Sequence, residues 1–310
     1  MGGSDRRARL RGTYERTPHG GGTTDRRRDT SDDREDDQRP PALPIRRPGA
    51  GGGPTQRPGG TRSAGWPTSG SPRCWCPDFP QLQPAPGPTL SLAAALAPGL
   101  RVGTWVYASP FRPVWSTAWE AHSLSLLTEG RFEFGIGTGR PGIEDELRAL
   151  GMPVVPRAER LDRMREVVRR LRDLDGTDRH TPVVLAVRGP KAQALAAEIA
   201  DTVAFALMPG EDRAVLTRAV QDFRARSSRD VELAQQVAVV GDTIAPHLAT
   251  PDLDPDALRA ADALEVLPTD PKAAVEELLR RREEIGFSYF VVGAVHAETL
   301  APVITELTGR

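Results

Sequence analysis

The stretch EGRFEFGIGTGRPGIEDELRALGMP, residues 129–153, joins a short apolar run to an acidic, helix-like segment through closely spaced glycines. Its first part, residues 131–137, has the composition of a buried strand, and further glycines follow where that strand would end. Glycine serves where the chain turns sharply or where another group must come close to the backbone. A phosphate or a flat ring is such a group, and a phosphate also binds the free N–H groups at a helix start. The stretch therefore predicts a strand, a ligand-binding turn and a helix.

Strand-like and helix-like segments alternate from about Thr89 to the end of the chain. Each strand-like segment is a continuous apolar run, and the segments between them carry apolar residues at helical spacing. This alternation predicts a parallel sheet covered by helices. It fits both an open doubly wound sheet and an eight-stranded barrel. We predict six strands after residue 99, within 100–106, 131–137, 182–187, 201–207, 235–242 and 288–293.

Helical spacing also predicts which side chains face the sheet. Around the segment 116–127, one apolar stripe is formed by Trp115, Trp119, His122 and Leu126. We expect the stripe to pack inward, which makes His122 a core histidine in preference to a catalytic one.

Capping signals mark the ends of two helices. The segment 269–286 begins with a capping residue, Thr269 or Asp270, followed by Pro271, and it stops at Gly286. The acidic residues 144–146 are typical of a helix's first turn, where the helix dipole favours negative charge.

The bulk composition limits the classes of partner. The chain has 310 residues and a formal net charge of −1, so no overall field draws it toward nucleic acid or an anionic membrane. Its two cysteines, Cys74 and Cys76, are too few and too close for a disulfide framework or a zinc site. No run of about 18 apolar residues occurs, and the N-terminus lacks an apolar signal core. We expect a soluble, cytoplasmic protein that acts on a small molecule.

Residues 1–63 differ in character from the rest of the chain. They mix Arg, Gly, Asp, Thr and Pro and contain almost no aliphatic residues. Such a segment cannot bury enough apolar surface to offset the entropy of ordering, so we predict that it is disordered. A basic nucleic-acid-binding arm is the alternative, but aspartates alternate with the arginines and cancel most of the attraction. We assign residues 64–310 to the folded domain.

The predicted strands point to candidate binding residues. In both parallel architectures, ligands bind at the carboxyl ends of the strands. This rule selects residues 107–109, 137–140 and 188–191, with Gly293 and His296 after the last strand. His296 is a candidate for the cleft, and a solvated loop histidine is the alternative.

The turn at 188–191 is the better of two glycine-containing candidates for phosphate. Gly189 ends a strand and Pro190 begins a helix, so free N–H groups and the positive end of the helix dipole meet there. Lys191 would add a charge. An ordinary strand-to-helix turn is the alternative. By contrast, Gly135, Gly137 and Gly139 give G-x-G-x-G rather than the dinucleotide pattern G-x-G-x-x-G.

Other catalytic patterns are missing from the sequence. It shows no Ser-His-Asp spacing, no metal-ligand cluster and no phosphate loop with lysine. A protein with few polar catalysts at its cleft often leaves the chemistry to a cofactor.

Several segments, in order, resemble the bacterial luciferase-like monooxygenase family, most closely its oxidoreductases that use the deazaflavin coenzyme F420. The segments are AHSLSLLTEGRFEFGIGTGRPGIEDELRALGMP, RAERLDRMREVVRRLRDL, PVVLAVRGPKAQALAAEIADTVAF and AAVEELLRRREEIGFSYFVVG with LAPVITEL. The resemblance covers roughly residues 88–310. It implies a (β/α)8 TIM-type barrel that binds coenzyme F420, or alternatively FMN, at the strand carboxyl ends.

The resemblance also assigns residues to the cofactor. Its phosphate would lie near Gly189 and Pro190, flanked by Arg188 and Lys191. Thr138, Gly139 and Arg140 would line the cofactor, and residues 103–106, including Thr104, would support the face of the ring. The family tends toward homodimers.

The N-terminal part departs from the family. There, a first strand, a helix and a second strand ending in Asp, often beside His, are expected. The segment 64–80, AGWPTSGSPRCWCPDFP, resembles a damaged remnant in which Asp78 matches the acidic position and Phe79 replaces the histidine. We therefore predict a barrel that is incomplete or degraded at its N-terminal strands. We hypothesise that the preceding segment is a mis-started or frameshifted reading of a GC-rich gene.

The predicted activity is that of a flavin- or deazaflavin-dependent oxidoreductase. It would perform hydride transfer or oxygen-dependent monooxygenation on a small organic substrate, with Asp78 and His296 as the candidate catalytic residues. A non-catalytic protein that binds F420 or FMN is the alternative. A sugar- or phosphate-metabolising barrel enzyme is a third reading, but the carboxylate or lysine constellation that it needs is missing.

Overall fold

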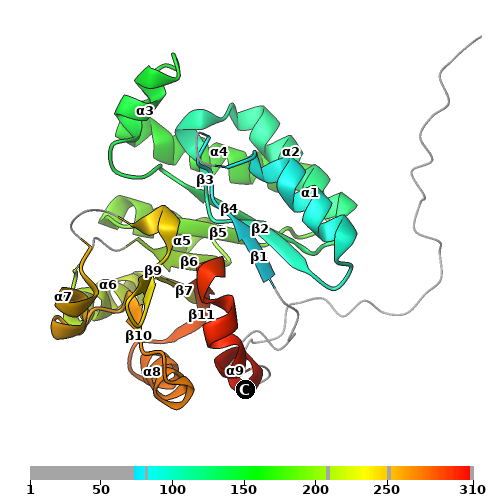
Figure 1. Cartoon of the computed structure of the whole chain (residues 1–310). Helices are drawn as coiled ribbons and strands as arrows, with labels where there is room; N and C mark the ends of the chain where they lie inside the picture. Colours follow the sequence, from blue (N-terminus) through cyan, green and yellow to red (C-terminus); the bar gives the residue numbers. More distant parts are fainter. Residues whose placement is uncertain (1–72, 81–82, 207–209, 250–252, 308–310) are drawn as a thin grey trace, which may run out of the picture. The chain divides into compact units, whose positions relative to one another are not determined.

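Parallel strands that follow one another both in the sequence and in space form the centre of the structure (Figure 1). The computed structural model describes residues 73–80, 83–206, 210–249 and 253–307, all within one compact unit, Gly59–Arg310. In these ranges the main strands, in spatial order, are β1 (Arg73–Cys76), β2 (Arg101–Thr104), β4 (Phe132–Gly137), β5 (Val183–Val187), β6 (Thr202–Phe205), β7 (Glu232–Val237) and β11 (Phe287–Val292).

The strand order decides between the two predicted architectures. A doubly wound sheet reverses its order at a switch point, whereas a barrel keeps chain order around its circumference. Here chain order is kept, and every pairing among the main strands is parallel. The short strand β3 (Tyr107–Ala108) follows β2 in the chain and, like β2, pairs with β4. The sheet is therefore a curled, incomplete TIM-type barrel, which confirms the fold prediction and the six strands expected after residue 99.

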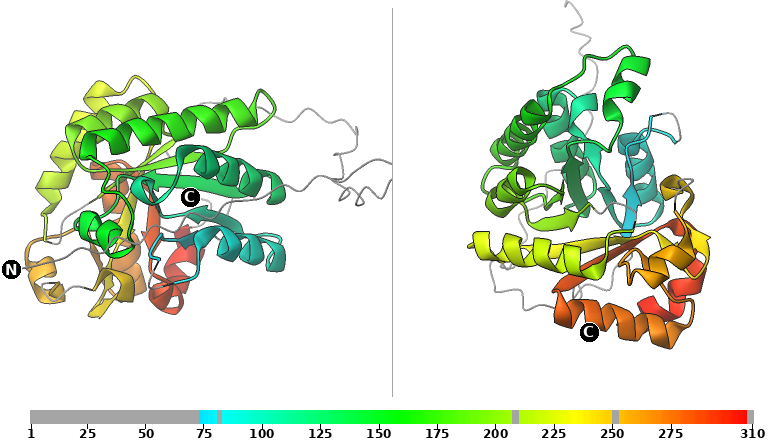
Figure 2. Two further views of the ribbon diagram at one scale, coloured as in Figure 1. Left: turned by 90° about the horizontal axis from the view of Figure 1, so that it is seen from above. Right: turned by 90° about the vertical axis from the view of Figure 1, so that its left-hand side faces the viewer.

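Helices cover the outside of the curled sheet (Figures 1 and 2). The outer helices are α1 (Pro86–Leu96), α2 (Val114–Leu127), α4 (Arg157–Asp175), α5 (Pro190–Ile199), α6 (Arg213–Arg226), α8 (Pro271–Glu284) and α9 (Ala297–Leu307). Smaller elements lie in the connections: α3 (Ile143–Ala149), α7 (Pro255–Ala260), the 3₁₀ turns η1 (Ser109–Phe111), η2 (Pro246–Leu248) and η3 (Ala294–His296), and a three-stranded sheet of β8 (Val239–Val240), β9 (Thr243–Ile244) and β10 (Val266–Leu267). Among the described residues, no helix is both long and apolar enough to cross a membrane.

The main core lies between the sheet and the helices. Phe132, Phe134 and Ile136 alternate along β4 and pack outward against helical residues such as Met164 and Leu171. The residues between them face the inside of the curl, as the two-residue period of a strand requires. This alternation explains why the decisive stretch is apolar at every second position and glycine-rich at the others.

One predicted helix face is wrong. The stripe on α2 that contains Trp115, Trp119 and Leu126 is exposed, and the helix buries Ala118 and Ala121 instead. Small residues allow α2 to lie close to its neighbours, and the larger side chains point away. His122 is half-buried rather than part of an apolar core, and its Nδ1 lies 2.8 Å from Asp175 Oδ1 on α4.

Side chains join the first and last strands across the inside of the curl. Within the described residues β1 and β11 are not hydrogen-bonded to each other, but the rings of Trp75 and Tyr289 lie 5.8 Å apart and the Arg73 guanidinium lies 5.1 Å from the Tyr289 ring centre. Glu133 on β4 accepts hydrogen bonds from Arg73 at 3.2 Å, Arg101 at 2.9 Å and the Tyr289 hydroxyl at 3.2 Å. The prediction for residues 1–63, and the segment 64–72, lie outside the described residues.

Candidate functional site

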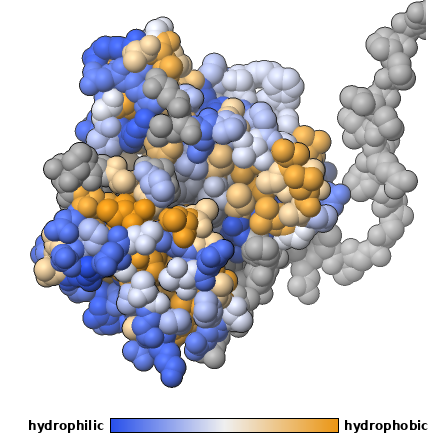
Figure 3. All heavy atoms as spheres, viewed as in Figure 1, coloured by the Kyte–Doolittle hydropathy of each residue, from blue (hydrophilic) through white to orange (hydrophobic). Residues whose placement is uncertain are grey.

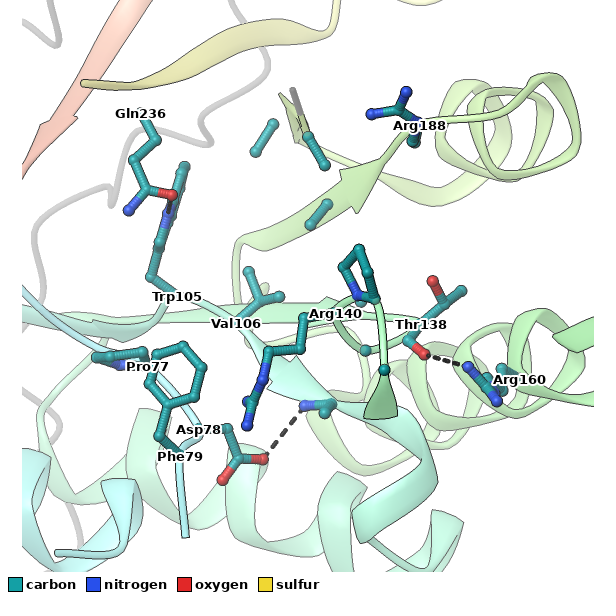
Figure 4. Close-up of a pocket in the computed structure, with 18 of the residues that line it drawn as sticks. Pro77, Asp78, Phe79, Trp105, Val106, Thr138, Arg140, Arg160, Arg188 and Gln236 are labelled. Atoms are coloured by element: carbon teal, nitrogen blue, oxygen red, sulfur yellow. Dashed lines mark hydrogen bonds between the residues drawn. The ribbon is translucent and has the colours of Figure 1, made fainter. Parts of the chain in front are cut away.

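A cavity of about 640 Å³ opens at the carboxyl ends of the strands (Figure 4). Its walls come from the residues that follow β1, β2 and β4 and from the ends of β5, β6 and β7. The volume falls in the range of about 300–1,000 Å³ that is typical of small-molecule sites. The strand-end rule therefore located the cavity correctly.

Small residues form one side of the cavity. Gly137 on β4, Ala186 on β5 and Ala204 on β6 line it, and none of them extends a long side chain into it. A Cβ atom added at Gly137 would lie 3.0 Å from Val106 Cγ2 and 3.3 Å from Ala186 Cβ. The result is an apolar surface without long side chains, at the place where three neighbouring strands end.

Larger apolar groups form the adjoining wall. Trp105, Val106 and Phe79 line the cavity, and the Trp105–Val106 peptide bond is cis. Trp105 Nε1 donates to Gln236 Oε1 at 3.2 Å, and its ring meets Trp75 edge-on at 5.2 Å, so the indole is fixed from two sides (Figure 4). Arg140 lies over the ring of Phe79, 4.4 Å from its centre, and thereby links the end of β4 to the end of β1.

Arginines also line the cavity and form its rim. Four of them line the cavity: Arg140, Arg157, Arg160 and Arg188. Three are in ion pairs, namely Arg140 with Glu146 at 2.6 Å, Arg160 with Glu144, and Arg188 with Glu211 at 2.8 Å. Arg157, at the first position of α4, makes no hydrogen bond or ion pair with any residue that the structure describes. Its charge acts only at longer range, where it helps Arg160 to lower the pKa of Glu144. The rim thus has one arginine available to an anion.

Asp78 lies at the cavity, but its carboxylate is already engaged. Arg112 donates to both oxygens, each at 3.1 Å, and the Ala108 N–H donates to Oδ2 at 3.2 Å. The Arg112 guanidinium also lies 3.8 Å from the centre of the Tyr107 ring. Burial lowers the pKa of Arg112, but the hydrogen bonds and charge of Asp78 outweigh burial and leave that pKa raised. These hydrogen bonds hold the Asp78 side chain in place and fix the segment that follows β2.

The structure brings together five of the predicted site residues. Asp78, Thr138, Gly139, Arg140 and Arg188 all line the cavity.

The structure places Gly189, Pro190 and Lys191 at the exposed start of α5, just outside the lining. A Cβ atom at Gly189 would meet nothing within 4 Å, so no close approach of the chain requires a glycine there. Their predicted contact with phosphate stays a prediction.

Two other predicted residues point elsewhere. Thr104 is buried between β2 and β4, where its hydroxyl donates to the Gly135 carbonyl and accepts from the Gly135 N–H, both at 2.8 Å. His296 is buried in η3, and its Nε2 lies 3.4 Å from the Ala238 carbonyl oxygen. Burial lowers the pKa of His296, which the Ala238 hydrogen bond offsets in part. Neither side chain lines the cavity, so the predicted roles have no support from their positions.

The glycines of the decisive stretch serve the chain itself as well as the cavity. A Cβ atom at Gly135 would lie 1.9 Å from the Thr104 carbonyl oxygen, so the neighbouring strand excludes any side chain there. Gly139 has φ of +89°, and a Cβ atom on it would lie 2.2 Å from Ile143 Cδ1. The interpretation that the glycines mark ligand contact is therefore too broad, because packing requires Gly135 and the positive φ favours Gly139.

Sequence reasoning missed many of the cavity residues, among them Phe79 as a wall, Gln236, Arg157 and Arg160. Gln236 lies one residue before the end of β7, and the strand-end rule would have found it with the correct boundary. Arg157 and Arg160 belong to α4, a helix with so many charged residues that the sequence does not show which of them reach the cavity. The sequence predicts no metal site. In the described ranges, no three His, Cys, Asp or Glu side chains are grouped to hold an ion.

A curled parallel sheet with a cavity at its strand ends defines the class of the fold, the α/β barrels, whose active sites are found at that end. Within this class, the sequence model of the luciferase-like monooxygenases matches residues 69–252, and the chain belongs to that family. No curated protein matches the sequence.

Solved structures with the same fold have little sequence identity with this chain. An F420-dependent tetrahydromethanopterin reductase from Methanopyrus kandleri is 16% identical with a TM-score of 0.56, and the match covers 78% of this chain and 92% of the reductase. A monooxygenase from Streptomyces bottropensis is 16% identical, with a TM-score of 0.57 and coverage of 79% and 90%. An EDTA monooxygenase from Chelativorans sp. BNC1 is 13% identical, with a TM-score of 0.54 and coverage of 75% and 82%. These similarities establish the fold.

Proposed function

We propose that this chain binds coenzyme F420, or alternatively FMN, and catalyses hydride transfer or oxygen-dependent monooxygenation of a small organic substrate. Membership of the luciferase-like monooxygenase family supports the reaction class. The observation that carries the proposal is the composition of the cavity, in which an apolar surface of small residues lies beside a rim of arginines. A flat heterocycle with an anionic side chain matches both halves at once, which a neutral apolar ligand or a simple phosphate does not.

The residues present fit such a cofactor. Gly137, Ala186 and Ala204 leave space for a planar ring, and Trp105 and Val106 form a rigid wall beside it. When bound, the cofactor supplies the hydride or activates oxygen.

The anionic part of the cofactor would be held by polar groups on the rim, namely Thr138, Gly139, Arg140, Arg157 and Arg188. In this proposal Gly189, Pro190 and Lys191 meet the outermost part of the side chain. F420 is the first choice of the proposal, since the reductase above and a secondary alcohol dehydrogenase of similar structure are F420-dependent; FMN, with which a structurally similar Baeyer-Villiger monooxygenase is in complex, is the alternative.

The chain's own residues position the ligand and exclude water. The hydrogen bond from Trp105 to Gln236 fixes the wall, and the contact between Arg140 and Phe79 narrows the cavity between β1 and β4. Asp78, held by Arg112, would accept hydrogen bonds from the bound molecules. We further propose that the enzyme works in the cytoplasm as a homodimer, with its catalytic domain within residues 64–310.

A titration of the purified chain tests cofactor binding. F420 and FMN are added separately, and quenching of their fluorescence is followed. We expect saturable binding of one of them, and absence of binding for both would overturn the proposal. Turnover with the reduced cofactor and a panel of small unsaturated and carbonyl substrates then tests the reaction.

A non-catalytic cofactor-binding protein is the second candidate. The observation that favours it is that the carboxylates lining the cavity, Asp78 and Glu144, are both engaged with arginines. His296 does not line the cavity either. Tight binding of F420 or FMN without turnover across the panel would decide for this candidate.

A further inference from the structure

The composition of the cavity changes from one side to the other. In Figure 4, Arg160 and Arg188 lie at one side, and a group of mostly apolar residues lies at the other. We call this group the aromatic end and define it by four lining residues: Pro77, Phe79, Trp105 and Gln236. They follow β1 and β2 or belong to the end of β7, so the curl of the sheet brings them together. By contrast, the outer surface over α1, where apolar residues are visible in Figure 3, has no part in the cavity.

The two rings of the aromatic end are held by their neighbours. Trp105 Nε1 donates to Gln236 Oε1 at 3.2 Å, and the Trp75 ring meets the Trp105 ring edge-on at 5.2 Å. The Arg140 guanidinium lies 4.4 Å from the centre of the Phe79 ring. Aromatic rings pair best in offset or edge-to-face arrangements, so flat walls of fixed orientation favour a flat ligand over a puckered one of the same size. Walls that are ordered before the ligand arrives also reduce the entropy cost of binding.

The charged groups that border the aromatic end already have partners. Asp78 pairs with Arg112 at 3.1 Å, and Arg140 pairs with Glu146 at 2.6 Å. A charged ligand would have to compete with one of these partners to be paired itself, whereas an uncharged ligand leaves both pairs intact. Asp78 lines the cavity, and a carboxylate offers hydrogen-bond acceptors only. A hydroxyl donor on an uncharged ligand therefore complements this end of the cavity.

We propose that the substrate is an uncharged aromatic compound that carries a hydroxyl group or a similar hydrogen-bond donor, and that Phe79 and Trp105 select it by its flat ring. This inference rests on the proposed function, in which the cofactor occupies the small-residue surface and the arginine rim. Trp105 then borders the cofactor ring, and the rest of the aromatic end is left to the second ligand. A flexible alkyl chain suits this end less well, because it makes no ring pair and loses more rotational freedom on binding.

Matched probes test the selection of a flat, uncharged ring. Benzyl alcohol, cyclohexylmethanol and benzoate contain the same number of carbon atoms, and each of the last two differs from the first in flatness or in charge. Each probe is titrated against the full-length chain, with and without F420 or FMN, and its affinity is measured by ligand-observed nuclear magnetic resonance. We expect benzyl alcohol to bind about 10-fold more tightly than either of the other probes and to leave the cofactor bound.

Substitutions of the two rings locate the selection. Phe79→Leu and Trp105→Leu should each weaken binding of benzyl alcohol about 10-fold and leave the affinity for cyclohexylmethanol nearly unchanged. The control Trp115→Leu removes a ring of α2 that is 58% exposed and does not line the cavity, and it should change neither affinity. If circular dichroism shows that Trp105→Leu disturbs folding, Phe79→Leu, at a half-buried residue, must give the loss alone.

Other outcomes overturn the inference. Equal affinities for benzyl alcohol and cyclohexylmethanol contradict it, and so does the absence of binding of all the probes. Tighter binding of benzoate would mean that the Arg140 charge, rather than the rings, selects the ligand. Displacement of the cofactor by benzyl alcohol would assign the aromatic end to the cofactor. The cofactor titration described above separates the two proposals: bound cofactor without probe selection overturns this inference alone, whereas failure to bind F420 and FMN overturns the proposed function.

Discussion

Arg157 is the residue on which the anion-binding half of the cavity depends most. The other rim arginines have carboxylate partners, so a ligand must compete for them, whereas Arg157 makes no hydrogen bond or ion pair with any described residue. We expect Arg157→Ala to weaken binding of F420 or FMN about 10-fold, equivalent to about 1.4 kcal/mol. Fluorescence titration of the wild type and the variant measures this change in affinity. Arg163→Ala, which removes an arginine already paired with Glu159 further along α4, is the control and should leave the affinity unchanged.

Glu265 is a buried carboxyl whose Oε2 atom has no hydrogen-bond partner among the described residues. Burial raises its pKa to about 7; the nearby charge of Glu211 adds to the rise and a hydrogen bond from the Gly210 backbone opposes it. In the unfolded chain a glutamate releases its proton near pH 4.3. Between these values the folded state binds more protons, so the stability that Glu265 contributes is present below about pH 4 and lost as the pH rises through about 7.

Glu265→Gln removes this dependence. We expect the variant to melt several degrees higher than wild type at pH 8 and to differ much less from it at pH 5, on a scale of roughly 2–4 °C per kcal/mol. Thermal unfolding followed by circular dichroism from pH 5 to 8 measures the difference. Glu283→Gln, at an exposed position of α8, should change neither value. A gain that is equal at both pH values would mean that titration of Glu265 is not the cause.

At the residue scale, the sequence revealed position along a strand better than side-chain direction. Asp78, Arg140 and Arg188 follow strand ends, and all three reach the cavity. Thr104 also ends a strand, but its hydroxyl bonds to the backbone of β4. The His296 side chain contacts the Ala238 carbonyl oxygen just after β7 and does not line the cavity. Which way a side chain points at a strand end depends on the connecting turn, and no periodic pattern records that turn.

At the scale of elements, local chemistry predicted α8 correctly. Asp270 Oδ1 accepts from the Ala273 N–H at 2.9 Å, Pro271 occupies the first turn, and Gly286 follows the end with φ of +99°. The stripe on α2 failed for a different reason. Helical periodicity shows that one face is apolar, but an interface and a core produce the same period. Here the small residues Ala118 and Ala121 face the protein, and the tryptophans face outward.

The N-cap of α8 gives a prediction that concerns this helix. Asp270→Ala removes the side-chain acceptor of the Ala273 N–H and should lower the free energy of unfolding by about 1 kcal/mol. The melting temperature should fall by about 2–4 °C. Glu276→Ala, at an exposed position of the same helix, improves helix propensity without touching a cap and should cause no loss. Equal losses in both variants would show that the cap contributes nothing specific.

At the scale of the whole molecule, the open curl is the feature that the sequence indicated only indirectly. The resemblance predicted that an N-terminal strand of the barrel is missing, and in the described residues β1 and β11 remain unpaired edges. The sequence did not reveal how the opening is bridged. Glu133, Arg73 and Tyr289 lie on three separate strands, and their meeting follows from curvature rather than from any local pattern. The contacts of Arg73 and Trp75 with the Tyr289 ring stand there in place of a ladder of hydrogen bonds.

Hydrogen exchange tests this arrangement. Edge strands lack one ladder, so amides of β1 and β11 should exchange faster than those of β5 and β6, which have neighbours on both sides. Trp75→Ala removes the ring that contacts Tyr289, at a cost of about 3 kcal/mol, and should accelerate exchange in β1 and β11 together. Leu150→Ala, at an exposed residue after α3, should leave both strands unchanged. Acceleration confined to β1 would mean that the two edges open independently and that the side-chain bridge does not couple them.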